Sequence, residues 1–386
     1  MKQKICIITG SRAEYGLLRP LMERIKSDKH YTLQLIVTGS HLSARFGNTY
    51  KEIVNDKFKI DSKIKIQQSD ENKISVPFAV GEAVKGISKS LEKLKPDLVV
   101  LLGDRYEILG AAIAAHLLSV PLAHIHGGEI TEGSLDDAMR HAITKLSLIH
   151  FTAAAAYHRR VIQMGEEPSR VFNVGSLGVE NSSQMKLLSK EVLERKIGLL
   201  LKQKVAVVTF HPATKEKINT RNQVKALIKA LKKLQGVQLI ITYPNADYGG
   251  KQIIEIMERF AAVNDNVHIY KNLGSLNYLS LLQFADVVIG NSSSGIIEVP
   301  SFGIPTVNIG DRQKLRMAAK SVIHVRPTES EILKAIQQAF KPSFIASCKQ
   351  FKNPYDNGSA SKNIISVLHQ FKNFRTIEKK FNDILS

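Results

Sequence analysis

The sequence has little cysteine and no long hydrophobic run, and both absences restrict what the protein can be. Only two of its 386 residues are cysteines, Cys6 and Cys348, and they stand far apart with no metal-binding or redox spacing. Reduced structural thiols are therefore expected, and no disulfide is predicted. No apolar run approaches the roughly 20 residues of a membrane-spanning helix, and residues 4–10 are too short an apolar run for a signal peptide. We expect a cytoplasmic protein with no membrane partner.

Negative charge is also scarce relative to positive charge. The chain has 54 Lys and Arg against 35 Asp and Glu, which gives a formal net charge of +19. Such an excess suits nucleic acid, a membrane surface or an anionic substrate. The most basic stretch, residues 184–233, spreads its charges along helix-like segments without interleaved aromatic residues. We interpret it as a solvated face and predict no nucleic-acid partner, with phosphate attraction and nucleic-acid binding as the alternatives.

Short apolar runs alternate with amphipathic stretches of helical length along most of the chain. The runs are KICIITG, LQLIVTG, DLVVLLGD, PLAHIHGG and VFNVGS in the first part, and VAVVTFHP, VQLIITYPN, NVHIYKN, DVVIGNSSSG, PTVNIG and SVIHV in the second. This alternation is typical of βαβ units, in which helices cover both faces of a parallel sheet. The fold class predicted is α/β, with two Rossmann-like doubly wound parallel-sheet domains and an interdomain cleft.

The length and the pattern together predict where the two domains lie. The chain exceeds the usual size of a single core, and we place an N-terminal Rossmann-like domain at residues 1–176 and a C-terminal one at residues 177–358. A helical segment at residues 359–386 is expected to join the first domain. Because open parallel sheets bind ligands beyond the carboxyl ends of their strands, we expect the functional site in the cleft between the two sheets.

Residues 124–141, HIHGGEITEGSLDDAMRH, follow a predicted strand and hold four carboxylates, three histidines and an arginine. Some of these ionisable groups are explained by ordinary helix-stabilising contacts alone. Ser134 and Asp137 have the spacing of a capping box, and Asp136 and Asp137 each stand four residues before a basic side chain, where ion pairs form along a helix. The remaining groups need another explanation.

Three ionisable groups are left without a local partner. His126 and Glu129 lie in the loop before the predicted helix, and Asp104 follows another strand in LLGDRYE. The structural alternative for Asp104 is an N-cap of the next helix. His124 and His126 alternate on one strand and are expected to point the same way, but no further ligands follow at zinc spacing. No metal site is predicted.

A first candidate anion site is TGSRAEYG, residues 9–16, which follows a strand and opens a helix. Gly10 and Ser11 can present backbone N–H groups at the helix N-terminus, and Arg12 adds a fixed positive charge, which together suit a diphosphate. The pattern is not GxGxxG, so it supports dinucleotide binding only weakly. The alternative is an ordinary strand-to-helix turn with a surface arginine.

A second candidate anion site is IGNSSSGIIEVPSFGIP, residues 289–305. Ser292 and Ser293 lead into a predicted helix, where hydroxyls and N–H groups can converge on phosphate oxygens. Glu298, within the first turns of that helix, repels phosphate but suits two ribose hydroxyls; the alternative is serine N-capping. His211 ends a strand in TFHPAT, and we expect it to contact phosphate or the transition state rather than to be purely structural.

Eight motifs in their order resemble the UDP-N-acetylglucosamine 2-epimerase family, and most closely the hydrolysing branch that feeds bacterial sialic-acid and legionaminic-acid synthesis. They are TGSRAEYGLLRPL, VTGSHL, LLGDRYE, HIHGGE…LDDAMRHAITKLS, VIQMGE, NVGSLG, FHPAT and GNSSSGIIEVPSFGIPTVNIGDRQ. The resemblance covers roughly residues 1–340. It implies a GT-B-like fold with UDP in the cleft and no metal or redox cofactor. A homo-oligomer, either dimer or tetramer, is also expected, although no motif specifies it.

The resemblance also implies a reaction. Loss of the C2 proton of a UDP-hexosamine is coupled to departure of UDP, and the resulting 2-acetamidoglucal is hydrated to the 2-epimeric free sugar. The positions that match catalytic ones in relatives are Asp104, Glu129, Asp136 and His211, with His126 standing where some relatives have Glu. The positions that match UDP-binding ones are Arg12, Ser292, Ser293, Glu298, Arg312 and Arg316.

The first-choice substrate is UDP-N-acetylglucosamine, which would yield UDP and N-acetylmannosamine. The alternative substrate is UDP-2,4-diacetamido-2,4,6-trideoxyglucose of the legionaminic-acid pathway, because no residue visibly reads the sugar C4 or C6 substituent. Two other classes stay open. They are a GT-B glycosyltransferase, which would need an acceptor, and a non-catalytic basic binding protein.

Overall fold

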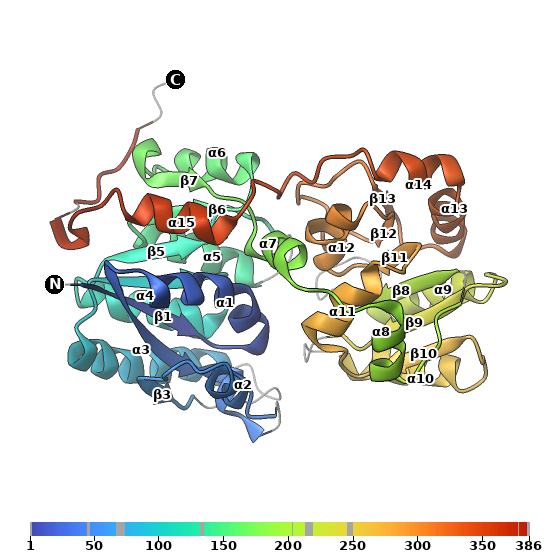
Figure 1. Ribbon diagram of the computed structural model, residues 1–386, viewed down its shortest axis with the longest axis horizontal. Coiled ribbons are helices and arrows are strands. Elements are labelled where there is room, and N and C mark those ends of the chain that lie inside the picture. The colour runs from blue at the N-terminus through green and yellow to red at the C-terminus, as the bar shows by residue number, and fades with distance from the viewer. Residues whose placement is uncertain are drawn as a thin grey trace. The chain divides into compact units, whose positions relative to one another are not determined.

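The computed structural model describes residues 2–44, 47–66, 74–131, 135–202, 204–212, 219–244, 250–376 and 378–383. The chain divides into two compact α/β units (Figure 1). Unit 1 comprises Met1–Glu129, Leu135–Glu180 and Asn357–Ser386, and unit 2 comprises Ile130–Ser134 and Asn181–Asp356.

Unit 1 is built on a seven-stranded parallel sheet with the order β3-β2-β1-β4-β5-β6-β7. Its strands are β1 (Gln3–Thr9), β2 (Tyr31–Thr38), β3 (Ser62–Ile64), β4 (Leu98–Leu102), β5 (Leu122–Ile125), β6 (Ile149–Thr152) and β7 (Val171–Asn173). Its helices are α1 (Arg12–Ser27), α2 (Tyr50–Asn55), α3 (Ser75–Leu94), α4 (Tyr106–Leu117), α5 (Leu135–Leu146), α6 (Ala155–Gln163) and α15 (Ala360–Leu368), and α7 (Leu177–Gln184) crosses the division between the units.

Helices cover both faces of this sheet, which explains why β4 and residues 5–8 of β1 are apolar without interruption. Successive residues of β1 point to opposite faces. Ile5 and Ile7 belong to one core with buried residues of α1 and α15, whereas Cys6 and Ile8 belong to another with buried residues of α3 and α4. The C-terminal helix α15 is therefore part of the core of unit 1 (Figure 1).

Unit 2 is built on a six-stranded parallel sheet with the order β10-β9-β8-β11-β12-β13. Its strands are β8 (Val205–Thr209), β9 (Gln238–Thr242), β10 (Val267–Tyr270), β11 (Val287–Gly290), β12 (Thr306–Ile309) and β13 (Val322–Val325). Its helices are α8 (Lys190–Ile197), α9 (Thr220–Leu231), α10 (Gly250–Ala261), α11 (Gly274–Leu282), α12 (Ser294–Ile297), α13 (Glu329–Ala339) and α14 (Pro342–Cys348).

The predicted α/β class with two parallel sheets is confirmed, and all eleven predicted strands are present. The sequence pattern missed two strands of unit 1. β3 has three residues and is an edge strand, and β6 has four residues and is separated from the end of α5 by only two residues. Across the described ranges, no helix is both long enough and apolar enough to cross a bilayer.

Candidate functional site

A buried arginine joins two loops at the carboxyl ends of adjacent strands β4 and β5. Asp104 lies two residues beyond β4, and Arg140 of α5 forms an ion pair with its carboxylate. A second guanidinium nitrogen of Arg140 donates to the backbone carbonyl of Glu129, at 2.8 Å, in the loop beyond β5. Arg140 is only 3% exposed. A buried charge is stable only when it is paired and hydrogen-bonded, so this arginine fixes the two loops relative to each other.

His126 and Glu129 form a pair within the second loop. The His126 Nδ1 lies 3.5 Å from the Glu129 Oε1, and both residues are buried. β5 ends at Ile125, and His126 has a φ of +67°, a left-handed conformation that is uncommon outside glycine. The expectation that His126 and Glu129 have no local partner is wrong, since they are partners of each other.

His124 is a structural residue that braces the site. Its Nε2 donates to the Gly103 carbonyl at 2.8 Å, and its Nδ1 lies 3.0 Å from the Thr144 hydroxyl of α5. Burial lowers the pKa of His124 to about 3, so the ring is neutral. β5 ends at Ile125, between His124 and His126, so the strand alternation on which their shared direction was expected does not extend to His126. Within the described part of the chain, no three His, Cys, Asp or Glu side chains form a metal-type cluster.

The two aspartates of α5 lie on its first turn and are partly exposed. The carboxylate of Asp137 lies 3.6 Å from Arg140 and 3.7 Å from His141, so it belongs to the Arg140 network. Asp136, the candidate for proton transfer, is its neighbour on this turn. Ser134 of the predicted capping box lies outside the described residues.

Asp104 does not cap the following helix. α4 begins at Tyr106, its N-cap residue is Arg105, and no side chain makes a capping hydrogen bond there. The structural alternative considered for Asp104 is therefore wrong, because its carboxylate is used by Arg140 instead.

The loop after β1 differs from the expected phosphate site. The backbone N–H of Gly10 donates to the Glu14 Oε2 at 2.8 Å, and the Ser11 hydroxyl accepts from the Glu14 N–H at 3.3 Å. A carboxylate thus occupies the position where an anion was expected. Arg12 forms an ion pair at 2.9 Å with Glu52, and both side chains are more than 40% exposed. Such an exposed pair stabilises little, and it leaves Arg12 able to exchange Glu52 for another anion.

Sequence reasoning missed a pair of buried carboxylates beside this loop, those of Glu14 and Glu107. Arg105 lies between them, 2.7 Å from the Glu107 carboxylate and 3.9 Å from the Glu14 carboxylate. Gly10 is required here because a Cβ would come within 2.5 Å of the Glu107 side chain. Burial and then the charge of Glu107 raise the pKa of Glu14 to about 8 against the opposing effect of Arg105. The Ser-x-x-Glu spacing was the available signal for Glu14.

Replacing Glu14 with Gln should make stability less sensitive to pH. A folded-state pKa of about 8, above the ordinary glutamate value of 4.5, means that the folded state holds a proton which the unfolded state loses. Stability therefore falls as pH rises from about 4.5 to 8. Gln still accepts from Gly10 but does not ionise. We therefore expect the difference in free energy of unfolding between the variant and the parent to shift in favour of the variant as the pH rises from 5 to 8.5. The expected shift is about 1 kcal/mol or more, measured by urea titration at the two pH values.

Glu23→Gln is the matched control, because Glu23 lies on the same helix and makes an exposed pair with Arg19. It should leave the slope of stability against pH nearly unchanged. Equal slopes for Glu14→Gln and the parent protein would show that Glu14 ionises in the fold without penalty.

In unit 2, His211 and Arg312 meet at Asn291, which sequence reasoning had not singled out. The His211 N–H donates to the Asn291 side-chain oxygen at 2.6 Å, and the Asn291 amide donates back to the His211 carbonyl at 2.9 Å. Arg312 donates to the Asn291 carbonyl at 3.0 Å. Burial and then the nearby Arg312 lower the pKa of His211 to about 3, so its imidazole is neutral.

The serine loop precedes a helix much shorter than expected. Ser293 is the N-cap of α12, which has four residues, and its side chain makes no capping hydrogen bond. Glu298 lies at the C-terminal end of α12 rather than near its start, so the expected N-terminal placement is wrong. Since α12 is about one turn long, its dipole adds little. Ser292 and Ser293 are partly exposed and thus accessible to a ligand.

Arg316 lies on the loop after β12, four residues beyond Arg312. Its backbone N–H donates to the Gln313 carbonyl at 3.1 Å, and the Gln313 side chain donates to the Asn291 carbonyl at 3.1 Å. The loop with both arginines is thereby tied to the end of β11. The structure thus brings together His211 and Arg312, with Arg316 on the same loop.

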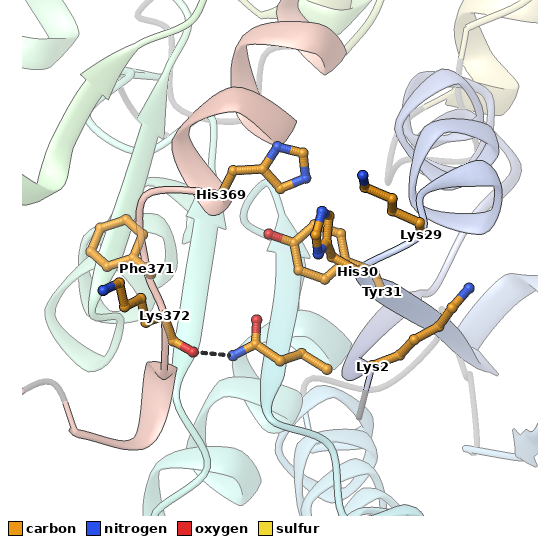
Figure 2. A pocket seen from close by; sticks show the side chains of 8 residues that line it. Lys2, Lys29, His30, Tyr31, His369, Phe371 and Lys372 are labelled. Atoms are coloured by element: carbon orange, nitrogen blue, oxygen red, sulfur yellow. Dashed lines mark hydrogen bonds between the residues drawn. The ribbon is translucent and has the colours of Figure 1, made fainter.

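A cavity of about 650 Å³ lies elsewhere in unit 1, at the amino-terminal ends of β1 and β2 (Figure 2). The rings of Tyr31 and His369 stack there with their centroids 5.4 Å apart, and Lys2, Lys29 and Lys372 also line it. Ligands of open parallel sheets bind at the carboxyl ends of the strands. We therefore do not assign this cavity to the substrate.

The fold places the protein in a known structural class. The structure of the UDP-GlcNAc 2-epimerase of Methanocaldococcus jannaschii, in complex with UDP-GlcNAc and UDP, is similar with a TM-score of 0.76 over 96% of this chain and 100% of that one, at 19% identity. The fold is thus GT-B-like, as predicted. A family model described as UDP-N-acetylglucosamine 2-epimerase matches residues 23–369. The chain belongs to the UDP-N-acetylglucosamine 2-epimerase family.

Two relatives refine this assignment. The GDP/UDP-N,N'-diacetylbacillosamine 2-epimerase (hydrolyzing) of Campylobacter jejuni is 44% identical over 91% of this chain and 89% of its own length. The UDP-N,N'-diacetylbacillosamine 2-epimerase (hydrolyzing) of Legionella pneumophila is 37% identical over 95% and 96%, respectively. The predicted membership of the hydrolysing branch is confirmed, and the protein is an enzyme of the hydrolysing 2-epimerase type.

Proposed function

We propose that the protein converts a UDP-linked 2-acetamido sugar into UDP and the free 2-epimeric sugar. A base removes the C2 proton while the C1–O bond to UDP breaks, which leaves a 2-acetamidoglucal. Water then adds its oxygen to C1 and gives up one proton to a base, while an acid donates a proton to C2 on the face opposite to the one from which the first proton was removed. The observation that carries this proposal is the buried network in which Arg140 holds Asp104 and the Glu129 backbone beside His126.

The proton transfers are assigned to Asp104, Glu129 and Asp136, with His126 as a further candidate. Proton transfer to and from carbon needs a base and an acid near the same ring. Glu129 and His126 are buried and lie 3.5 Å apart, so the two groups are close enough to act on the same sugar ring. Which of these groups acts as base and which as acid stays open.

UDP binding is assigned to residues of unit 2 together with Arg12. His211 is neutral because burial lowers its pKa, so it can contact a phosphate oxygen or the leaving group only through a hydrogen bond. The positive charge for the diphosphate is then supplied by Arg312 and Arg316, and the hydroxyls of Ser292 and Ser293 supply donors. Glu298 is proposed to accept hydrogen bonds from the ribose hydroxyls.

The sugar is proposed to be 2,4-diacetamido-2,4,6-trideoxyglucose, the sugar named N,N'-diacetylbacillosamine, in a legionaminic-acid-type pathway. The sequence analysis placed this sugar second and UDP-N-acetylglucosamine first. The names of the relatives at 44% and 37% identity favour the reverse order. N-acetylglucosamine, in a sialic-acid-type pathway, stays as the alternative.

The test is incubation of the protein with UDP-N,N'-diacetylbacillosamine, its GDP counterpart and UDP-N-acetylglucosamine in separate reactions. We expect release of UDP and of the free 2-epimer, identified by NMR, to be fastest with the first. Release with retained C2 configuration would indicate simple hydrolysis, and release only with an added acceptor would indicate a glycosyltransferase. Absence of turnover together with salt-dependent RNA binding would favour the basic binding protein.

Replacing Glu298 with Ala should weaken UDP binding by roughly 1–3 kcal/mol, because ribose hydroxyls lose a charged acceptor. Titration calorimetry measures this directly. The control is Glu329→Ala, a carboxylate of the same unit that pairs with Lys233. Unchanged UDP affinity in Glu298→Ala would remove this residue from the site.

A further inference from the structure

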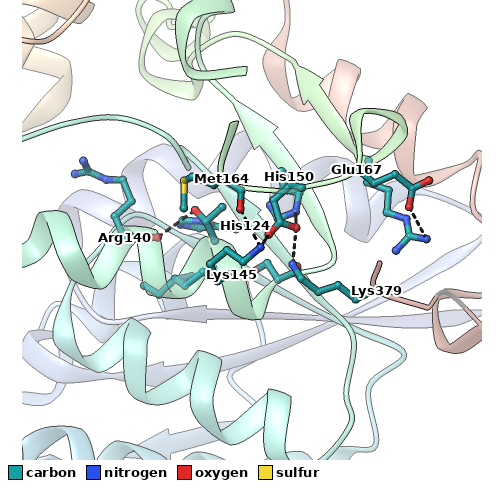
Figure 3. Close-up of polar contacts among 12 residues, drawn as sticks. His124, Arg140, Lys145, His150, Met164, Glu167 and Lys379 are labelled. Carbon is teal, nitrogen blue, oxygen red and sulfur yellow. Dashed lines mark hydrogen bonds and ion pairs between the residues drawn. The ribbon is translucent and has the colours of Figure 1, made fainter. Parts of the chain in front are cut away.

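Residues 378–383, here called the C-terminal strap, connect the ends of two helices of unit 1. The Lys379 ammonium donates to the Ser147 carbonyl, just beyond α5, at 2.5 Å. The same ammonium donates to the Glu166 carboxylate, just beyond α6, also at 2.5 Å. One side chain therefore joins the C-terminal ends of α5 and α6, and Figure 3 shows it near His150.

Two further contacts fix the strap at the end of α6. The backbone N–H of Asn382 donates to the Gly165 carbonyl at 3.0 Å. The ring of Phe381 packs so closely on Gly165 that a Cβ there would come within 2.5 Å of it. The Lys145 ammonium of α5 lies 4.9 Å from the centroid of the same ring, in cation–π range. The strap is thus seated on specific groups of both helices.

The carboxylate at the centre of this cluster has three charged or polar partners. Glu166 lies 2.6 Å from Lys145, 2.9 Å from the His150 Nε2 and 2.5 Å from Lys379. Burial would raise the pKa of Glu166, but the hydrogen bonds from His150, Lys145 and Lys379 outweigh it and lower the pKa to about 2. Loss of Lys379 alone would leave Glu166 paired with Lys145 and His150. We therefore expect the fold to survive that loss.

The same two helices also hold residues of the candidate site. α5 carries Asp136 on its first turn and Arg140, which binds the Glu129 carbonyl. α6 contributes Arg160, which lies in its last turn, at the end that the strap contacts, and donates to the carbonyl of Gly128. The two helices therefore hold neighbouring residues of one loop, and a change in the spacing of the helix ends that the strap joins changes the position of that loop.

We propose that the C-terminal strap positions the catalytic groups, with Lys379 as the positioning residue that sets α5 against α6. The proposal rests on the proposed function, because it predicts a loss of that activity. Lys379 donates to Ser147 and Glu166, and neither of these is one of the three candidate carboxylates. Its effect would be exerted on the distance between Asp136 and Glu129, and small displacements of catalytic groups are costly for rate.

The test compares Lys379→Met with Lys380→Met, since Lys380 is the adjacent exposed lysine of the strap. With the UDP-sugar substrate, we expect Lys379→Met to lower kcat about 10- to 100-fold. KM and UDP affinity should stay close to those of the parent, because the UDP-binding residues lie mainly in unit 2. Lys379→Arg, which retains charge and donors, should restore most of kcat. Lys380→Met should match the parent.

A readout independent of activity is amide hydrogen exchange over residues 135–146. We expect faster exchange in this segment for Lys379→Met but not for Lys380→Met. Should Lys379→Met melt below the assay temperature, Lys379→Gln is tested at a temperature below its own transition. Parental kcat and exchange in the Lys379 variant, or equal losses in both lysine variants, would overturn the proposal. Inactivity of the parent protein itself would overturn the proposed function instead, and the exchange comparison would still decide whether the strap positions α5.

Discussion

Asparagine in place of Asp104 is expected to lower kcat by about 10²–10⁴-fold, the range typical for a lost acid–base group. The carboxylate lies at the carboxyl end of β4 and is held by Arg140, which also holds the backbone of Glu129. Asn is nearly the same size and still accepts a hydrogen bond from Arg140, but it can neither take up a proton nor carry charge. Turnover with the UDP-sugar is the measurement.

The same substitution should affect stability far less than it affects turnover. Breaking a fully buried ion pair can cost about 3–5 kcal/mol. The Asp104 side chain, however, is 21% exposed. In the variant, Arg140 would still donate to the Glu129 carbonyl and would still have the Asp137 carboxylate 3.6 Å away. We expect the loss in free energy of unfolding, measured in urea, to stay below that range.

Asp137→Asn is the matched control, since Asp137 contacts the same arginine at longer range. It should retain most of the turnover. Near-parental turnover in a folded Asp104→Asn variant would restrict Asp104 to the structural role of holding Arg140. Equal losses in both variants would show that the charge around Arg140, rather than Asp104 itself, matters.

The sequence predicted the two sheets well because strands buried on both faces leave a strong signal. Ile5 to Ile8 is apolar throughout since its residues face two different cores. β3 leaves almost no signal because Ile64 is its one apolar residue. β6 is fully buried, but only two residues separate it from α5, so its short run merges with the helical pattern before it. The predictable strands are thus those whose apolar run stands apart from the neighbouring helical stretches.

The site was predicted by residue type and strand end, but its connections were not. The Arg140–Asp104 pair joins residues 36 apart, and no helical or strand spacing indicates it. Glu107 also escaped notice, since its partner Arg105 comes from a turn with no helical period. Local rules even misled at His126, where the left-handed backbone ends the strand alternation. Long-range pairing therefore had to come from the structure.

Turnover in D2O should place deuterium at C2 of the released sugar, essentially in every molecule. The proposed mechanism removes the original C2 proton and returns one from an acid that exchanges with solvent. Simple hydrolysis of the anomeric bond would leave C2 untouched, so the two mechanisms differ completely in this readout. NMR of the product reports both the isotope at C2 and its configuration.

Variants of Glu129 and Asp136, two of the three candidate carboxylates, should then divide the reaction into its halves. Glu129 is buried beside His126, whereas Asp136 is partly exposed on the first turn of α5, so the two are suited to different steps. A variant defective in hydration should accumulate the 2-acetamidoglucal together with UDP, and one defective in elimination should release neither. We expect Glu129→Gln and Asp136→Asn each to show one of these patterns, with Asp137→Asn showing neither. The mechanism is falsified if the product from D2O carries an undeuterated C2 or retains its original configuration.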